Sequence, residues 1–319
     1  MSATEDLPRA LRFIQRDWLS CNQLVLLEAD GATLIDSGYV KNATETVRLV
    51  GAALAGNGNT AGARDVQGNR PVPLARVINT HLHSDHCGGN AALAAAFGCE
   101  LMVPESSAAA VAAWDEEALT YKATGQRCAR FVATGTIAAG ETFRAANAEW
   151  IAHAAPGHDP ESLIFHCPEL GVLVSADALW EHGFGVIFPE LAGESGFAEE
   201  YAVLELIEAL APRIVIPGHG SAFTDAAGAI ARARSRLAAM ASDPARHARS
   251  ALKVLVKYRL LDYERETEAA MIAELSGASV MAASAVVLGI DPAAALMRTI
   301  DELVAQGQLR RDGDWLLNV

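Results

Sequence analysis

The sequence predicts a layered α/β protein in which helices cover the outer faces of β-sheets. Of its 319 residues, 51% are hydrophobic and 20% are charged, so the chain can bury the core of one large domain and carry a smaller appendage. Short apolar runs that stop at Gly, Asp or His alternate with segments of helical period. Helices prevail near the C-terminus. We therefore expect one domain over residues 1–224 and a helical domain over residues 225–319.

In the first half of the chain, the expected strands are short and bounded by turn signals. Asp30-Gly31 predicts a hairpin turn between the first two strands. Residues 56–72 are rich in Gly and Asn and have no hydrophobic period, which indicates a loop. We expect strands at residues 23–28, 33–35, 76–79 and 101–103, and helices at residues 43–55, 91–97 and 105–122.

The second half begins with closely spaced strands and ends in helices. Pro292 suits the first turn of the last helix, and Gly307 ends it. The tail is expected to form a hairpin around Asp312-Gly313. The C-terminal helices together with this hairpin resemble a small winged-helix module. We expect strands at residues 142–144, 149–151, 162–165, 172–174 and 213–216, and helices at residues 198–210, 225–241, 246–261, 265–276 and 292–306.

The charge of the chain argues against a polyanionic partner. The formal net charge is −14 at pH 7. Residues 244–319 contain nine Lys or Arg and ten Asp or Glu, a balance of 9 − 10 = −1, whereas nucleic-acid-binding modules are usually basic. Nucleic acid is therefore not expected as a partner. The C-terminal domain is expected to pack over the active site or to form a homodimer interface.

The cysteine pattern favours reduced thiols over a disulfide framework. The five cysteines are odd in number, scattered and without a C-x-x-C pair. The N-terminus shows neither the basic nor the apolar region of a signal peptide, and the apolar stretches are too short to span a bilayer. These features predict a cytoplasmic protein with no membrane partner. The cysteines are Cys21, Cys87, Cys99, Cys128 and Cys167.

A dense cluster of histidine and aspartate follows the strand expected at residues 76–79. The run His81-Leu82-His83-Ser84-Asp85-His86 contains four potential metal ligands in six positions. Neutral imidazoles and carboxylates suit divalent first-row ions, and burying them without partners would be costly. The cluster therefore predicts a metal site, with His81, His83, Asp85 and His86 as candidate ligands. Cys87 follows the cluster and is expected to be a small buried thiol.

Three later residues have the same chemistry and the same position relative to strands. His158, Asp177 and His219 each end or follow an expected strand, and glycines stand beside both histidines. Groups at strand ends are held by a rigid sheet and still face a loop region, and glycine lets the backbone approach closely. These three residues are therefore expected to complete the site.

These motifs together resemble the metallo-β-lactamase-fold hydrolases, in the branch of glyoxalase II and the lactonases. The run Thr80–Gly89 is similar to the signature of that superfamily, and the resemblance spans roughly residues 12–222. The other motifs match in order and are Leu34-Ile35-Asp36-Ser37-Gly38, Pro156-Gly157-His158, Ala176-Asp177 and Pro217-Gly218-His219-Gly220.

The resemblance implies a fold and a metal centre. The fold would be α/β (or α+β), a four-layer αββα sandwich with the winged-helix-like C-terminal domain, and residues 1–224 would form the catalytic domain. Two divalent ions would lie at one edge, with zinc expected and iron or manganese open. By position, one ion would be held by His81, His83 and His158. The other would be held by Asp85, His86 and His219, with Asp177 bridging both.

The resemblance also implies a reaction on a small-molecule substrate. A hydroxide shared by the two ions would attack the carbonyl of an ester, thioester or lactone, and Asp85 and His219 would take part in catalysis. Asp36 is expected to contact a ligand histidine rather than a metal. Past Asp177, a loop that contains Trp180, His182 and Phe184 could line the substrate pocket. For His182 the ordinary role of a packed or solvated loop residue is favoured, whereas Trp180 and Phe184 fit a pocket wall or the core equally well.

Two other activities of the same fold remain open. A phosphodiesterase or ribonuclease would use the same two metals, and a sulfur dioxygenase would use one iron. His83 stands where the diiron flavoproteins of the superfamily carry Glu, which argues against oxygen reduction by a diiron centre. Glyoxalase II members hold the carboxylates of glutathione with basic residues. No equivalent Lys/Arg cluster is evident before residue 244, so glutathione is not assigned as part of the substrate.

Overall fold

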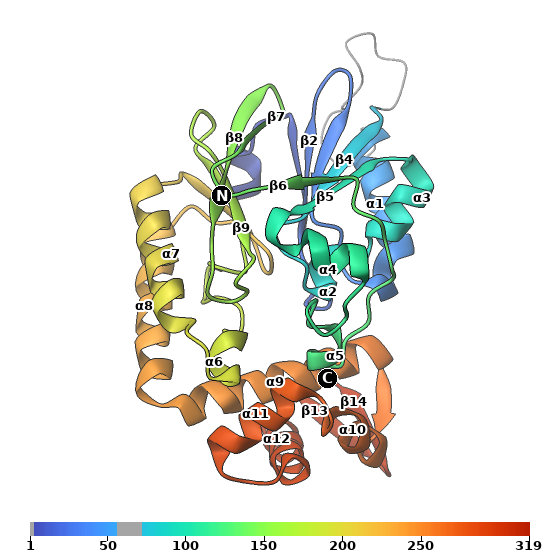
Figure 1. Ribbon diagram of the computed structural model, residues 1–319, viewed down its shortest axis with the longest axis vertical. Coiled ribbons are helices and arrows are strands. Elements are labelled where there is room, and N and C mark those ends of the chain that lie inside the picture. The colour runs from blue at the N-terminus through green and yellow to red at the C-terminus, as the bar shows by residue number, and fades with distance from the viewer. Residues whose placement is uncertain (1–2, 56–71) are drawn as a thin grey trace.

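Two β-sheets face each other and helices cover their outer sides (Figure 1), in a computed structural model that describes residues 3–55 and 72–319. The expected loop at residues 56–72 lies outside the described residues except for Val72. The first sheet has the strand order β1-β2-β3-β4-β5-β6, and the second has the order β11-β10-β9-β8-β7.

The first sheet begins antiparallel and continues parallel. The pairs β1–β2 and β2–β3 are antiparallel, whereas β3–β4, β4–β5 and β5–β6 are parallel. Its strands are β1 (Leu11–Ile14), β2 (Gln23–Leu27), β3 (Ala32–Ile35), β4 (Leu74–Ile78), β5 (Glu100–Pro104) and β6 (Gly135–Ile137).

The second sheet is antiparallel except for the pair β10–β11. A parallel pair needs a crossover connection, which here contains α6 (Phe188–Ala192) and α7 (Phe197–Leu210). The strands are β7 (Thr142–Ala145), β8 (Ala148–Ala154), β9 (Leu163–Cys167), β10 (Val172–Ala176) and β11 (Ile214–Pro217).

The central strands β2, β3, β9, β10 and β11 are buried on both faces, and alternate side chains belong to different cores. In β2, Leu24 and Leu26 belong to the cluster between the two sheets, whereas Val25 packs in the outer cluster under the helices. In β9, Phe165 faces the inner cluster and Ile164 the outer one. Because neighbouring side chains of a strand point to opposite faces, these continuous apolar runs require a layer on each side of both sheets.

Helices supply those two outer layers. Helices α1 (Ala43–Ala55) and α3 (Asn90–Phe97) cover the first sheet, with Leu54 and Leu93 in its outer cluster. Helix α7 and helix α8 (Ala226–Ser242) cover the second sheet in the same way. The four-layer αββα sandwich expected from the sequence is therefore confirmed.

The C-terminal segment crosses one end of the sandwich (Figure 1). Helix α9 (Pro244–Tyr263) packs against α8, α11 and α12, and most of the segment shares a core of its own. The strands of its small sheet lie in the order β12-β14-β13. Its remaining elements are β12 (Arg265–Thr267), α10 (Glu268–Leu275), α11 (Ser279–Leu288), α12 (Pro292–Ala305), β13 (Leu309–Asp312) and β14 (Trp315–Asn318). The winged-helix comparison and a domain boundary after residue 224 stay predictions.

Two expected helices are wrong in detail, and α11 is the longest of the helices that were not expected. The helix at residues 105–122 is instead a 3-10 turn, a short α4 (Ala108–Ala113) and α5 (Tyr121–Thr124), because Trp114 takes a left-handed conformation with φ 54°. The helix at residues 265–276 begins as β12, and Thr267 caps α10. Helix α11 has no clear polar face, so its hydrophobic period gives no signal.

The length and composition of the described helices bear on a membrane span. No single helix in residues 3–55 or 72–319 is both long and apolar enough to cross a bilayer. Helices α10 and α11 reach the necessary length and hydropathy only when taken together, as a pair bent by 93°.

Candidate metal centre

The polar residues singled out in the sequence meet at one edge of the sandwich, because four strands end there. Strand β4 leads into the His81–His86 run, which continues in the short helix α2 (Ser84–Cys87). The ends of β8, β10 and β11 lead to His158, Asp177 and His219, respectively. All seven candidate ligands are buried, with exposed fractions of 7% or less.

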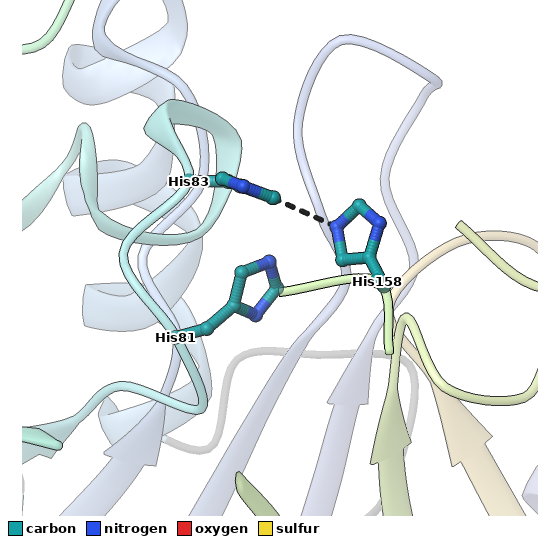
Figure 2. A group of neighbouring side chains, drawn as sticks. All are labelled: His81, His83 and His158. Carbon is teal, nitrogen blue, oxygen red and sulfur yellow. Dashed lines mark hydrogen bonds between the residues drawn. The ribbon is translucent and has the colours of Figure 1, made fainter. Parts of the chain in front are cut away.

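The seven side chains form two neighbouring groups. Potential ligand atoms of His81, His83 and His158 lie within 4.8 Å of one another, and Figure 2 shows their rings turned toward a common centre. The Nδ1 atom of His83 lies 2.7 Å from Nε2 of His158. In the second group, potential ligand atoms of Asp85, His86, Asp177 and His219 also lie within 4.8 Å of one another.

The carboxylate of Asp177 lies between the two groups. Its Oδ2 is 3.4 Å from Nε2 of His158 in the first group. Its Oδ1 is 3.4 Å from Nε2 of His86 and 4.0 Å from Nε2 of His219 in the second group. One carboxylate therefore presents a different oxygen to each set of imidazoles.

The donor set fits divalent metal ions. Nε2 of His81 and Nε2 of His86 are buried and have no hydrogen-bond partner, an arrangement that costs free energy unless another ligand satisfies them. Burial lowers the pKa of His83 and of His158 to about 4, so both rings are neutral near pH 7. Neutral imidazoles beside carboxylates form a typical nitrogen–oxygen ligand set.

Hydrogen bonds from outside the cluster fix the orientation of two histidines. Asp36 Oδ2 lies 2.9 Å from Nδ1 of His86, and the same carboxylate accepts the hydroxyl and the backbone N–H of Thr80, both at 2.8 Å. Nδ1 of His158 donates to the carbonyl of Val186 at 2.5 Å. In both histidines Nε2 is thereby directed into the cluster, as metal ligands require. The expected contact between Asp36 and a ligand histidine is present.

Two glycines are required by the close approach of backbone to the cluster. A Cβ atom at Gly218 would collide with the carboxylate of Asp177, and one at Gly185 would collide with the ring of His158. Any larger residue at either position would displace a candidate ligand.

A cavity of about 490 Å³ opens directly onto the cluster. Its floor includes five of the seven candidate ligands, and Trp180 and Phe184 form part of its wall. His182 does not line it: its side chain is 79% exposed and lies 3.8 Å from Glu181. Of the three pocket residues expected from the sequence, the structure thus brings two to the cavity. The floor residues are His83, Asp85, His158, Asp177 and His219.

Several residues of the site had no signal in the sequence. The hydroxyl of Tyr258, in α9, donates to Asp85 Oδ2 at 2.7 Å and reaches the cluster from the C-terminal segment. Trp18 stacks on His219 with ring centroids 5.4 Å apart. Cys21 forms a third compact group with Asp36 and His86. None of these three lies in a recognisable motif, so only the folded chain reveals them.

Three basic side chains also line the cavity, and the sequence analysis did not recognise them as a cluster. Arg236 comes from α8, and Lys253 and Lys257 come from α9. Lys253 pairs with Glu302 at 2.9 Å, and Lys257 donates to the carbonyl of Gln308 at 3.0 Å. The guanidinium of Arg236 lies 5.1 Å from the centre of the Phe184 ring. The cavity lining therefore combines the imidazoles and carboxylates of the cluster with these three basic side chains, which we call the basic rim.

The sequence around this cluster of residues matches a known protein family. The model of the metallo-beta-lactamase superfamily matches residues 16–219, which is more than half of the chain. The chain belongs to the metallo-beta-lactamase superfamily. This confirms the assignment made from the Thr80–Gly89 run and from the later motifs.

Curated relatives are similar over a limited region. The chain is 26% identical over 121 residues to a hydroxyacylglutathione hydrolase from Rhizobium etli, a match that covers 38% of this chain and 40% of that protein. It is 28% identical over 165 residues to thioesterase pkgB from Emericella nidulans, covering 50% of this chain and 38% of that one. The matches thus span about two fifths of the length of these relatives.

Solved structures of the superfamily show the same fold. A metallo-beta-lactamase family protein from Thermus thermophilus superposes with a TM-score of 0.54 at 18% identity, covering 97% of this chain and 98% of that one. A metallo-beta-lactamase from Cronobacter sakazakii has a TM-score of 0.54 at 15% identity over 75% of this chain and 96% of that one. The first likeness extends through the C-terminal segment.

The contact between Asp36 and His86 predicts a measurable effect on metal binding. We expect Asp36→Asn to weaken the affinity for Zn²⁺ by about 10- to 100-fold, because an amide no longer holds His86 as a carboxylate does. Competition with a chromophoric chelator measures the affinity. Asp30→Asn, in the β2–β3 turn, serves as the control. Equal affinities of Asp36→Asn and the wild type would show that this contact does not position the ligand.

Proposed function

We propose that the protein is a dinuclear metal-dependent hydrolase that cleaves a carbonyl ester, thioester or lactone. The observation that carries this proposal is the position of Asp177, whose two oxygens face different histidine groups. A carboxylate so placed suits a bridge between two ions, and seven ligands leave coordination positions for water and substrate.

The proposed ligands are those expected from the sequence. His81, His83 and His158 would hold one divalent ion, and the Asp85 group would hold the other, with Asp177 shared. Zinc is the proposed metal, and iron or manganese also suits nitrogen and oxygen donors. Divalent ions held by these residues would lower the pKa of bound water enough to supply a nucleophile at neutral pH, and would polarise a substrate carbonyl.

Residues around the second group would position the reacting atoms. Asp85 and His219, proposed as both ligands and catalytic residues, lie 2.9 Å apart between Oδ2 and Nε2 and open onto the cavity. Tyr258 donates its hydroxyl hydrogen to the same Oδ2 of Asp85, which fixes the direction of that carboxylate. Trp18 stacks on the His219 ring and restricts its rotation.

The cavity favours a substrate with an apolar part and an anionic group. Trp180 and Phe184 offer apolar surface near the metal ligands, and Arg236, Lys253 and Lys257 offer positive charge farther along the wall. No ion pair joins Arg236 to a carboxylate of residues 3–55 or 72–319. We therefore propose an anionic acyl thioester as the preferred substrate class, which agrees with the names of the hydroxyacylglutathione hydrolase and thioesterase relatives.

A panel of substrates tests the proposed reaction. Zinc-loaded protein is expected to hydrolyse acyl thioesters with an anionic thiol part, and p-nitrophenyl esters more slowly, because the basic rim adds binding energy only for an anion. Release of free thiol is measured with a thiol reagent. Efficient cleavage of RNA without any esterase activity would favour the phosphodiesterase alternative. Oxygen uptake with glutathione persulfide by iron-loaded protein would favour the sulfur dioxygenase alternative.

The basic rim predicts a specific kinetic effect. We expect Arg236→Ala to raise KM for an anionic thioester about tenfold with little change in kcat, because a charge-assisted contact away from the reacting carbonyl is lost. Arg232→Ala, on the same helix and paired with Asp225 at 3.6 Å, is the matched control and should leave KM unchanged. Equal KM values for Arg236→Ala and the control would contradict the assignment of Arg236 to substrate binding.

A further inference from the structure

Two cysteines next to the metal centre have their sulfur atoms in contact. Among the five cysteines, which all lie in the described part of the chain, Cys87 and Cys128 are the pair joined by a sulfur contact, with their Sγ atoms 3.7 Å apart. They are 41 positions apart in the sequence, so the fold alone brings them together. We propose that Cys87 and Cys128 form a redox-active dithiol that closes to a disulfide when a peroxide reaches Cys128.

The surroundings hold the two thiols in place. Cys87 is fully buried as the last residue of α2, where its thiol contacts the carbonyls of Leu82 and His83 at 3.3 and 3.4 Å. The hydroxyl of Tyr121 lies 3.1 Å from the same sulfur. Since the sulfurs of a disulfide are about 2.05 Å apart, closure requires them to approach by roughly 1.7 Å. Rotation of the two side chains, together with a local adjustment of the backbone, would have to supply that distance, and only weak contacts of the thiols oppose it.

The segment that carries Cys128 is held by the two residues that precede this cysteine. It has no regular secondary structure between α5 and β6, so its backbone can adjust locally. Gln126 accepts the hydroxyl of Ser84 in α2, and Arg127 forms an ion pair with Asp262 in α9. These contacts keep Cys128 beside Cys87, so the effective concentration of one thiol relative to the other is high.

The two thiols differ in access, which sets the order of events. Cys128 is partly exposed and Cys87 is not, so the peroxide meets Cys128 first. The sulfur of Cys128 attacks the peroxide oxygen; an S–O bond forms, the O–O bond breaks, and one water leaves. The sulfur of Cys87 then attacks the sulfenic sulfur; the S–S bond forms, the S–O bond breaks, and the oxygen leaves as a second water with the proton of Cys87. Two thiols lose two electrons and the peroxide gains them.

The disulfide would act on the candidate metal centre through α2. This short helix also carries Asp85 and His86, and Gln126 in the partner segment lines the cavity. A covalent link draws the sulfur of Cys87 away from the carbonyls of Leu82 and His83, and so shifts the turn that presents the ligands. Oxidation is therefore expected to slow hydrolysis reversibly. This consequence rests on the proposed function, whereas formation of the disulfide does not.

Hydrogen peroxide tests the chemical step directly. After treatment, the full-length wild type is expected to lose two of its five free thiols, and non-reducing digestion should give a peptide linking Cys87 to Cys128. Dithiothreitol should restore both thiols. Cys128→Ser should give no linked peptide, whereas Cys99→Ser, which alters a buried cysteine outside the pair, should still give it.

Two outcomes would overturn the proposal. One is oxidation of Cys128 to sulfinic or sulfonic acid with no linked peptide, and the other is a peptide that links a different pair of cysteines. Thioester hydrolysis by the same samples tests the consequence separately: the wild type should lose activity and regain it with dithiothreitol, and Cys128→Ser should resist the loss. Equal loss in Cys128→Ser would contradict the link to α2, while an absence of any hydrolysis would count against the proposed function alone.

Discussion

The buried cluster of imidazoles and carboxylates at the end of the two sheets constrains the rest of the structure. Four strands must end at the same edge, since each leads to at least one of the candidate ligands. Backbone must pass so close at Gly218 and Gly185 that no Cβ fits. Nitrogen atoms such as Nε2 of His81 have no partner in the protein, and burying them unpaired would oppose folding. A bound cation would resolve this conflict, and folding would then be coupled to metal binding.

The C-terminal segment is part of the same arrangement. Helix α9 crosses the end of the sandwich where the ligands emerge, and Tyr258 from this helix reaches Asp85. The same helix brings Lys253 and Lys257 to the cavity wall. Arg127 and Tyr39, which belong to the sandwich, both bind Asp262 at the end of α9. The segment therefore helps to shape the site.

The strands and the His81–His86 cluster could be predicted because both depend on local patterns, whereas the four-layer sandwich and the full set of seven candidate ligands came from the resemblance to a family. Each ligand stands at the end of a short apolar run, and strands with buried faces are visible in single segments such as β9 and β10. The His81–His86 run needs no tertiary information to suggest a metal. The positions of Arg236 and Tyr258 could not be predicted, since they arise from the packing of α8 and α9 on the sandwich. The helix at residues 105–122 was misjudged because a left-handed Trp114 leaves no mark in a hydrophobic pattern. His182 lies on an exposed loop, the ordinary role that the sequence favoured for it over the pocket.

The central claim is that Asp177 joins two metal positions within one buried cluster. Elemental analysis of protein saturated with Zn²⁺ and then freed of excess metal, for the wild type and for Asp177→Asn, tests it most directly. The account predicts two zinc ions per wild-type chain and at most one in Asp177→Asn. A wild-type chain that holds a single ion, or an Asp177→Asn chain that keeps two, would contradict it.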